Sequence, residues 1–414
     1  MTRHSPSSFQ HENAILLDAC RIGPPARPAP AASCNWDYLL RAATYQGVAP
    51  LLYEWAAHAS PGPTPEIASR LYHHYWATHF RNRALLAELE AIAEAAAAAG
   101  VDVVPLKGAD LAARVYPSPA LRPMSDVDLL VRAEHLDRMR DVLQSRGYED
   151  FSMSMSYVDD ERLDRGSFEH RWQGSRDGVS ILVEFRAEPM EPSVCRLADL
   201  DPALSLALRE HTAAMWSRRV PTPAGPRLSA GDLFLHVATH LAAKHGEFRL
   251  IWLHDLARTA ASPAPLDWAA LGAAAGRLQV SGPVYAAMQA AARLMAAPIG
   301  DAALEQFQRA AQPHAHGLLR NWEQQTLARE AERLRTADLT QEGPALSRLV
   351  TGLGRLRGWR SRLRALRWVA LPSRPYLDRW PDYRSAPRAF GYAGAWFRRY
   401  RSAVARRFRR RTLP

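Results

Sequence analysis

Two aspartates one residue apart are the strongest chemical signal in the chain. They lie in "LRPMSDVDLLV", residues 121–131, which otherwise has the apolar character of a buried β-strand. Side chains alternate between the faces of a strand, so Asp126 and Asp128 project from one face while Val127 and Leu129 project from the other. Two carboxylates held this close repel each other, and a cation between them removes the repulsion. Because Mg²⁺ takes one or two protein carboxylates and completes its shell with water and phosphate oxygens, the pair predicts a metal–phosphate site.

A third carboxylate and an anion-facing turn are expected beside this pair. In "SILVEFR", residues 180–186, apolar and polar residues alternate again, and Glu184 projects from the polar face. Upstream, "PLKGADLAA" runs from a strand through Gly108 into a helix, whose first N–H groups and positive dipole end favour an anion. Three carboxylates can hold one or two Mg²⁺ ions that position a triphosphate and an attacking hydroxyl.

The elements that position these residues follow from periodicity and turn residues. We expect helices over 66–99, 109–116 and 133–147, a strand within 101–108, the aspartate strand, and a strand pair within 168–189 that turns at "RDG". Everything after about residue 195 has a helical pattern. The predicted fold class is α+β, with a small mixed β-sheet core and flanking helices. This core is embedded between an N-terminal helical segment and a larger C-terminal helical region. The predicted boundaries are 1–99, 100–192, 193–345 and 346–414.

The positive charge of the chain is concentrated at its C-terminus. The net charge is +11, but 18 arginines follow residue 354 against Asp378 and Asp382, which leaves the first 354 residues at about −5. These arginines alternate with aromatic residues, as on a surface for nucleic acid or lipid headgroups. A helical tail with solvated arginines explains the pattern at least as well. No run of eighteen apolar residues and no signal peptide is present, so we expect a cytoplasmic protein without a transmembrane segment. Its three cysteines are too few for a disulfide framework.

A helical block at 236–257 carries a second group of polar residues. His236, His240 and Lys244 form a polar stripe at helical spacing in "LFLHVATHLAAKHGEF". An anion-binding surface and a hydrogen-bonded core are nearly equally favoured. A metal site with His254 and Asp255, as in phosphohydrolases, is least favoured, because an ammonium beside a cation is unfavourable.

The run "LKGADLAARVYPSPALRPMSDVDLLV", residues 106–131, resembles the signature of the uncharacterised nucleotidyltransferase family, within the DNA polymerase β-like nucleotidyltransferase superfamily. That superfamily has a glycine-bearing turn, a short helix, Asp-x-Asp on a strand and a third acid on a later strand. The block at 236–257 and "LPSRPYLDRW" at 371–380 also resemble the family. Two positions differ from its pattern. The usual Gly-Ser turn is Lys107-Gly108-Ala109 here, and Arg186 stands where relatives often have His.

The resemblance implies an Mg²⁺-dependent nucleotidyltransferase that moves a nucleoside monophosphate from an NTP, such as ATP, to an acceptor with release of pyrophosphate. The acceptor would be a small molecule, a peptide or a protein. The implied catalytic residues and metal ligands are Asp126, Asp128 and Glu184, and the implied nucleotide-binding residues are Lys107, Gly108, Arg122, Ser125 and Lys244. Lys107 would supply as a charge the phosphate contact that the missing serine provides in relatives. For Arg122, a salt bridge that fixes its loop is an equally supported role.

Three other functions remain open at this point. A catalytically silent relative that binds nucleotide or a partner protein is favoured by the loss of the turn serine, and the presence of all three carboxylates speaks against it. Nucleic-acid binding through the Arg/aromatic C-terminal segment would leave the α+β core as a scaffold. A phosphohydrolase built on the histidine block comes last.

Overall fold

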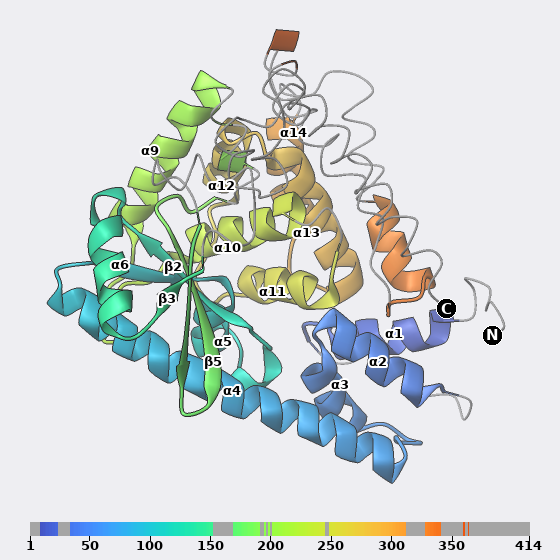
Figure 1. Ribbon diagram of the computed structural model, residues 1–414. Helices are drawn as coiled ribbons and strands as arrows, with labels where there is room; N and C mark the ends of the chain where they lie inside the picture. The colour runs from blue at the N-terminus through green and yellow to red at the C-terminus, as the bar shows by residue number, and fades with distance from the viewer. Residues whose placement is uncertain are drawn as a thin grey trace, which may run out of the picture.

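The computed structural model describes residues 9–23, 34–151, 169–190, 194–195, 198, 201–244, 248–311, 328–340, 359–360 and 363, the side chains of residues 243 and 244 excepted. The predicted C-terminal segment, 346–414, lies outside the described residues apart from the last three of these positions. The blocks of helix and strand are shown in Figure 1.

One mixed sheet forms the centre of the predicted α+β core. Within the described residues its order is β1-β2-β5-β4-β3. The strands are β1 (Val103–Leu106), β2 (Asp126–Val131), β3 (Glu149–Asp150), β4 (His170–Arg176) and β5 (Val179–Arg186). β2 and β5 run parallel, and the other neighbours run antiparallel. The predicted fold class is therefore confirmed, with β3 as a short strand that the sequence did not predict.

One face of the sheet is covered by helices. The long helix α4 (Pro65–Ala98) begins with Thr64 as N-cap, whose side chain accepts a hydrogen bond from the Ile67 N–H, and has Pro at its first position. It packs with α6 (Leu136–Ser145) on the sheet, where Leu85 and Ile92 share a core with Val127 and Val183. The apolar residues that alternate along β2 and β5 are thus buried under α4 and α6, which leaves the polar residues of both strands on the opposite face.

The N-terminal helices and the later helices share a second core. Leu16 and Leu40 from the N-terminal part pack in one cluster with Phe234, Leu253 and Met288. The helices of this core are α1 (Gln10–Ala19), α2 (Trp36–Gln46), α3 (Ala49–Ala56), α9 (Pro202–Arg218), α10 (Ala230–Thr239), α11 (Leu250–Ala260), α12 (Trp268–Arg277), α13 (Ser281–Met295) and α14 (Asp301–Ala311). Shorter elements are α5 (Lys107–Arg114), η2 (Pro119–Leu121), η3 (Ala133–His135) and the π-helical turn η5 (His240–Lys244).

The helices differ in length, but none in the described part of the chain combines the length and apolar character that crossing a membrane requires. The three cysteines are free thiols, of which Cys20 and Cys195 are buried.

Candidate active site

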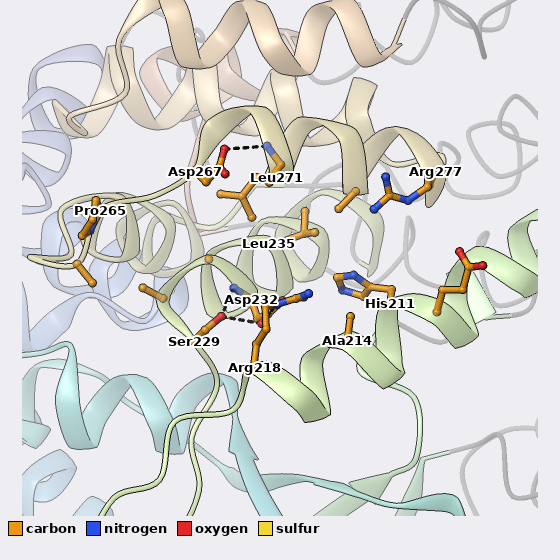
Figure 2. Close-up of a pocket in the computed structure, with 16 residues that line it drawn as sticks. His211, Ala214, Arg218, Ser229, Asp232, Leu235, Pro265, Asp267, Leu271 and Arg277 are labelled. Atoms are coloured by element: carbon orange, nitrogen blue, oxygen red, sulfur yellow. Dashed lines mark hydrogen bonds and ion pairs between the residues drawn. The ribbon is translucent and has the colours of Figure 1, made fainter.

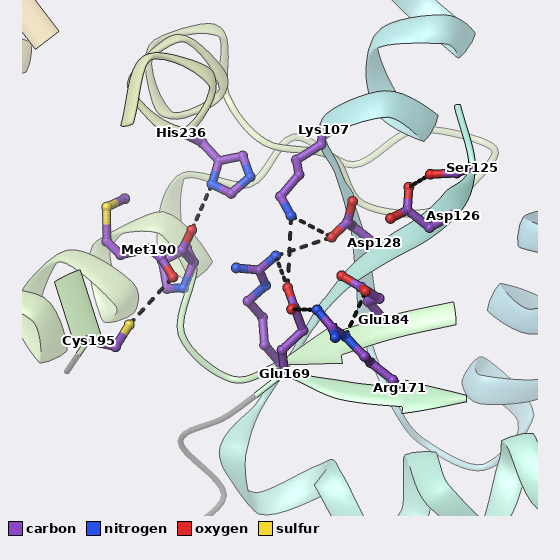
Figure 3. A network of polar contacts seen from close by, with 12 residues as sticks. Lys107, Ser125, Asp126, Asp128, Glu169, Arg171, Glu184, Met190, Cys195 and His236 are labelled. Carbon is purple, nitrogen blue, oxygen red and sulfur yellow. Dashed lines mark hydrogen bonds and ion pairs between the residues drawn. The ribbon is translucent and has the colours of Figure 1, made fainter. Parts of the chain in front are cut away.

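Three buried carboxylates meet on the polar face of the sheet. Asp128 on β2, Glu184 on β5 and Glu169, just before β4, each place one oxygen within 4.8 Å of the other two. We call these three residues the acid cluster. The strand register produces it, because Asp128 lies opposite Glu184 across the parallel pair, and Glu184 lies opposite Arg171 on β4. Figure 3 shows the three side chains pointing toward one another.

Glu169 is the member of this cluster that the sequence analysis missed. The signal was present in "FEHRWQ", residues 168–173, where Glu169, Arg171 and Gln173 alternate with bulkier neighbours. The two-residue period of a strand places Glu169 on the same face as Arg171, and Arg171 pairs with Glu184. The predicted strand pair within 168–189 included Glu169, but its place beside Glu184 depends on the pairing of β4 with β5.

Three cations balance the acid cluster. The Lys107 Nζ atom lies 2.7 Å from Asp128 Oδ1 and 4.0 Å from Glu169 Oε1. Arg186 places Nη2 3.1 Å from Asp128 Oδ1 and 2.8 Å from Glu169 Oε1. Lys107 and Arg186 are themselves buried, with 6% and 3% of their surface exposed. Each of these two cations is therefore shared between the same two carboxylates.

The third cation holds the remaining edge of the cluster. Arg171 places Nη2 2.9 Å from Glu169 Oε2 and Nε 2.9 Å from Glu184 Oε1. Arg171 thus joins the carboxylate of Glu169 to that of Glu184, as Lys107 and Arg186 join Glu169 to Asp128. These three acidic residues and three cations form one network of ion pairs, in which every residue but Arg171 is buried.

The environment of Glu184 favours its protonated form. The pKa of this carboxyl is raised to about 8, mainly by burial and also by the nearby carboxylates of Glu169 and Asp128, while Lys107 and Arg171 oppose the shift. A buried carboxyl beside like charges disfavours its ionised form. A divalent cation on the acid cluster would reverse this preference, since it adds positive charge where the carboxylates crowd.

Asp126 and Ser125 lie at the start of β2, beside the acid cluster. Asp126 is half-buried, and its Oδ1 accepts a hydrogen bond from the Ser125 hydroxyl at 3.2 Å. Its side chain shares the face of Asp128, two residues earlier on the strand, but is not one of the three carboxylates of the acid cluster. The structure therefore brings Asp128 and Glu184 together, places Asp126 next to them, and adds Glu169.

The first residue of α5 has an unusual backbone. Lys107 has φ +48°, a left-handed conformation that costs a residue with a side chain about 1 kcal/mol or more. Gly108 follows it, and a Cβ there would lie 3.2 Å from Met124 Cβ and 3.3 Å from Arg122 Nη1. The glycine therefore lets α5 approach the loop that leads into β2. The strained turn directs the Lys107 ammonium onto Asp128.

Arg122 forms a salt bridge, which the sequence analysis gave as the alternative to nucleotide binding. The guanidinium makes a bidentate contact with Asp255 on α11, with Nε 2.8 Å from Oδ1 and Nη2 2.8 Å from Oδ2. The Tyr116 hydroxyl donates to the same carboxylate at 2.7 Å. Only 8% of the Arg122 surface is exposed. This contact fixes the loop before β2 to the helical region.

Two residues of the histidine block, His236 and His254, lie in the hydrogen-bonded core. The Nδ1 atoms of His236 and His254 lie 2.7 and 2.8 Å from the carbonyl oxygens of Pro189 and Cys20. The spacing predicted for the stripe is not kept, because α10 ends at Thr239 and the chain continues as the π-helical turn η5. The side chain of Lys244 lies outside the described residues. His240 lies against Trp252, with ring centroids 5.9 Å apart.

A separate cavity of about 810 Å³ lies between α9, α10 and α12 (Figure 2). Its lining includes His211, Arg218, Asp232 and Arg277, and the Arg218 guanidinium lies 2.6 Å from the Asp232 carboxylate. Burial lowers the pKa of His211 to about 4. No residue of the acid cluster lines this cavity, so the acid cluster and the polar residues of the cavity belong to different parts of the fold.

Comparison with known families shows which family carries the acid cluster. The model of a family described as uncharacterised nucleotidyltransferase matches residues 32–296, more than half of the chain. The chain belongs to this family. Comparisons with curated proteins and with solved structures gave no match.

The family match confirms the resemblance inferred from residues 106–131 and makes the chain a transferase of phosphorus-containing groups. It begins earlier than the sequence indicated, within the N-terminal helices that share a core with the later ones. It ends at residue 296, before the block at 371–380. All three residues of the acid cluster lie inside the matched range.

The donor set of the acid cluster fits a hard divalent cation. Three carboxylate oxygens close together suit Mg²⁺, which prefers oxygen ligands and keeps open positions for water and phosphate. Within the described part of the chain, no other group of three or more His, Cys, Asp or Glu side chains meets in this way. The histidine block therefore forms no such group there.

Proposed function

We propose that this nucleotidyltransferase moves a nucleoside monophosphate from an NTP to an acceptor hydroxyl in an Mg²⁺-dependent reaction that releases pyrophosphate. The convergence of Asp128, Glu169 and Glu184 in a chain of this family carries the proposal. Mg²⁺, when bound, would neutralise triphosphate oxygens and make the α-phosphorus more electrophilic. Asp126 and Asp128 would hold it on the triphosphate. Glu169 and Glu184 would hold a second ion or receive the proton of the acceptor hydroxyl.

Lys107 would change partners when nucleotide binds. In the structure its ammonium lies on Asp128, 2.7 Å away. When a metal takes that carboxylate, the ammonium becomes available for a phosphate oxygen a few ångströms further out. Ser125 and Gly108 lie at the same end of β2 and α5 and would line the phosphate path. For Lys244 nucleotide binding stays a prediction, and for Arg122 we propose that it orients the loop by holding Asp255.

The test is calorimetric titration of the full-length protein with ATP, GTP, CTP and UTP, each with Mg²⁺. The double variant Asp126→Asn/Asp128→Asn is compared with wild type and with Asp137→Asn, a matched control whose side chain is 90% exposed on α6. We expect micromolar binding of one nucleotide in the wild type and the control and its loss in the double variant. If the wild type binds none of the four nucleotides, the proposal fails.

A catalytically silent nucleotide-binding relative is the second candidate. The observation that favours it is the pairing of all three carboxyl groups with Lys107, Arg171 and Arg186, which gives each of them a cationic partner without a metal. The same titration distinguishes the two. Nucleotide binding that is equal with Mg²⁺ and with EDTA, together with no pyrophosphate release in the presence of candidate acceptors, would favour the silent relative. The acceptor and the predicted nucleic-acid surface of the C-terminal segment stay predictions.

A further inference from the structure

One face of α4 is exposed along its whole length. Residues spaced three or four apart lie on one side of a helix, and nine such residues of α4 are all exposed. They are Pro65, Ser69, Tyr72, Trp76, Phe80, Arg83, Ala87, Glu90 and Glu94. We call this set the α4 stripe. It covers about eight turns, and Figure 1 shows α4 along the edge of the molecule, with its N-terminal half extending past the sheet.

The centre of the α4 stripe is aromatic. Tyr72, Trp76 and Phe80 are 47%, 37% and 65% exposed. Their rings touch in sequence, with centroids 6.1 Å apart between Tyr72 and Trp76 and 5.8 Å apart between Trp76 and Phe80. A contiguous exposed aromatic patch bordered by charged residues marks an interaction surface, whereas scattered apolar side chains do not.

The order of residues along the α4 stripe makes it complementary to itself. We propose that α4 packs antiparallel against α4 of a second copy of this chain, with the two-fold axis beside Phe80. In this register Trp76 of each copy faces Arg83 of the other, a cation–π pair made twice. Tyr72 faces Ala87 of the other copy, so a large side chain meets the smallest of the stripe.

The C-terminal end of the α4 stripe is acidic, and the N-terminal end lies at the positive end of the helix dipole. Glu90 and Glu94, near the C-terminal end, face Ser69 and Pro65 in the first turns of the other copy's helix. The N-terminus of a helix carries partial positive charge, which favours carboxylates beside it. The same antiparallel arrangement aligns the two helix dipoles favourably. Shifting the register by one turn would place Arg83 opposite Tyr72 or Phe80 in place of Trp76 and would separate Tyr72 from Ala87, so the proposal specifies one register.

The experiment uses the full-length chain and two independent measurements. Light scattering with size-exclusion chromatography gives the molar mass of wild type and of Trp76→Glu, an exposed position whose replacement leaves the core intact. Disulfide trapping compares Phe80→Cys with Ala77→Cys, both made in a Cys34→Ser background. Ala77 is also exposed on α4 but lies outside the α4 stripe. Circular dichroism verifies that each variant keeps its helical content.

We expect the wild type at twice the chain mass of 46.1 kDa and Trp76→Glu at the single-chain mass. Phe80→Cys should form a disulfide-linked dimer at least tenfold faster than Ala77→Cys, because the axis brings the two copies of residue 80 together. A monomeric wild type at 50–100 μM, on the order of a weak dimer's Kd, overturns the proposal. So does a dimer that survives Trp76→Glu or that crosslinks equally at both positions.

Discussion

Two buried ionic groups flank the loop that enters β2, and they differ in how their charges are shared. In one, Arg122 and Asp255 face each other one to one, with two parallel contacts and the Tyr116 hydroxyl as an additional donor. In the other, the three carboxylates of the acid cluster share three cations. A dedicated pair is rigid and has no capacity for another ion. A shared network can exchange one cation for a metal or lose one to a phosphate, which is what chemistry at that face requires.

The largest expected effect tests the dedicated pair. Asp255→Asn leaves the buried Arg122 charge without its counter-ion, and breaking a buried pair in this way costs about 4 kcal/mol. We expect that loss in the free energy of unfolding, measured by urea titration with tryptophan fluorescence. Nucleotide binding should persist at protein concentrations and temperatures where the variant is folded.

The double variant Arg122→Met/Asp255→Leu is the control for this prediction. Replacing both charges with apolar groups of similar volume removes the orphaned charge, so most of the stability should return. If Asp255→Asn unfolds like the wild type but no longer binds nucleotide, Arg122 and Asp255 belong to the active site and the contrast between the two groups is wrong.

A smaller effect, on the pH dependence of stability, tests the shared network. The pKa of Glu184 is about 8 in the folded chain and about 4.5 when the chain is unfolded, mainly because of burial. Between these values the folded state binds the extra proton, so this group stabilises the fold fully below pH 4.5 and less as the pH rises through 8. From pH 6 to pH 8 we expect the contribution of Glu184 to the free energy of unfolding, taken as wild type minus Glu184→Gln, to fall by about 2 kcal/mol.

Glu184→Gln should remove this contribution, because glutamine resembles the protonated acid at every pH. The measurement is urea unfolding at pH 6, 7 and 8, in EDTA and in Mg²⁺. His170, His211 and His254 have pKa values lowered from 6.5 to about 4 by burial, so each of them adds stability as the pH rises through 6.5 and opposes the Glu184 contribution. The difference between wild type and Glu184→Gln at each pH removes this histidine contribution, because both proteins carry the same histidines. A wild-type slope equal to that of Glu184→Gln would show that Glu184 is ionised and that the network is as rigid as the Arg122 pair.

Local patterns predicted the parts of the site that alternate along one strand. Asp126, Asp128 and Glu184 project from the polar face because their neighbours are apolar, and a two-residue period is visible without a structure. The helix predicted over 66–99 matches α4 within a residue or two, since a proline start and a glycine beyond the end are local signals.

Partners distant in the sequence could not be predicted in this way. Asp255 lies 133 residues from Arg122, and no local pattern indicates which carboxylate a loop arginine meets. The spacing of His236 and His240 suggested one polar stripe, but the change from α-helix to π-helical turn at His240 alters the direction of every side chain that follows. Assigning Glu169 to the site requires the pairing of β4 with β5, which only the tertiary structure shows.

The smallest expected effect separates backbone from charge at Lys107. Lys107→Ala and Lys107→Gly remove the same ammonium from Asp128, so both should weaken nucleotide binding equally if Lys107 acts through its charge. They differ in the backbone, because alanine is strained at φ +48° and glycine is not. We therefore expect Lys107→Gly to be more stable than Lys107→Ala by about 1 kcal/mol, measured by urea unfolding.

At Ala113, in the regular part of α5, the order should be the reverse, with Ala113→Gly less stable by about 1 kcal/mol. If glycine is the less stable residue at both positions, position 107 is not strained, and the turn no longer distinguishes the shared network from the Arg122 pair. If the two Lys107 variants differ in nucleotide affinity as well as in stability, the turn itself, and not the ammonium alone, holds the phosphates.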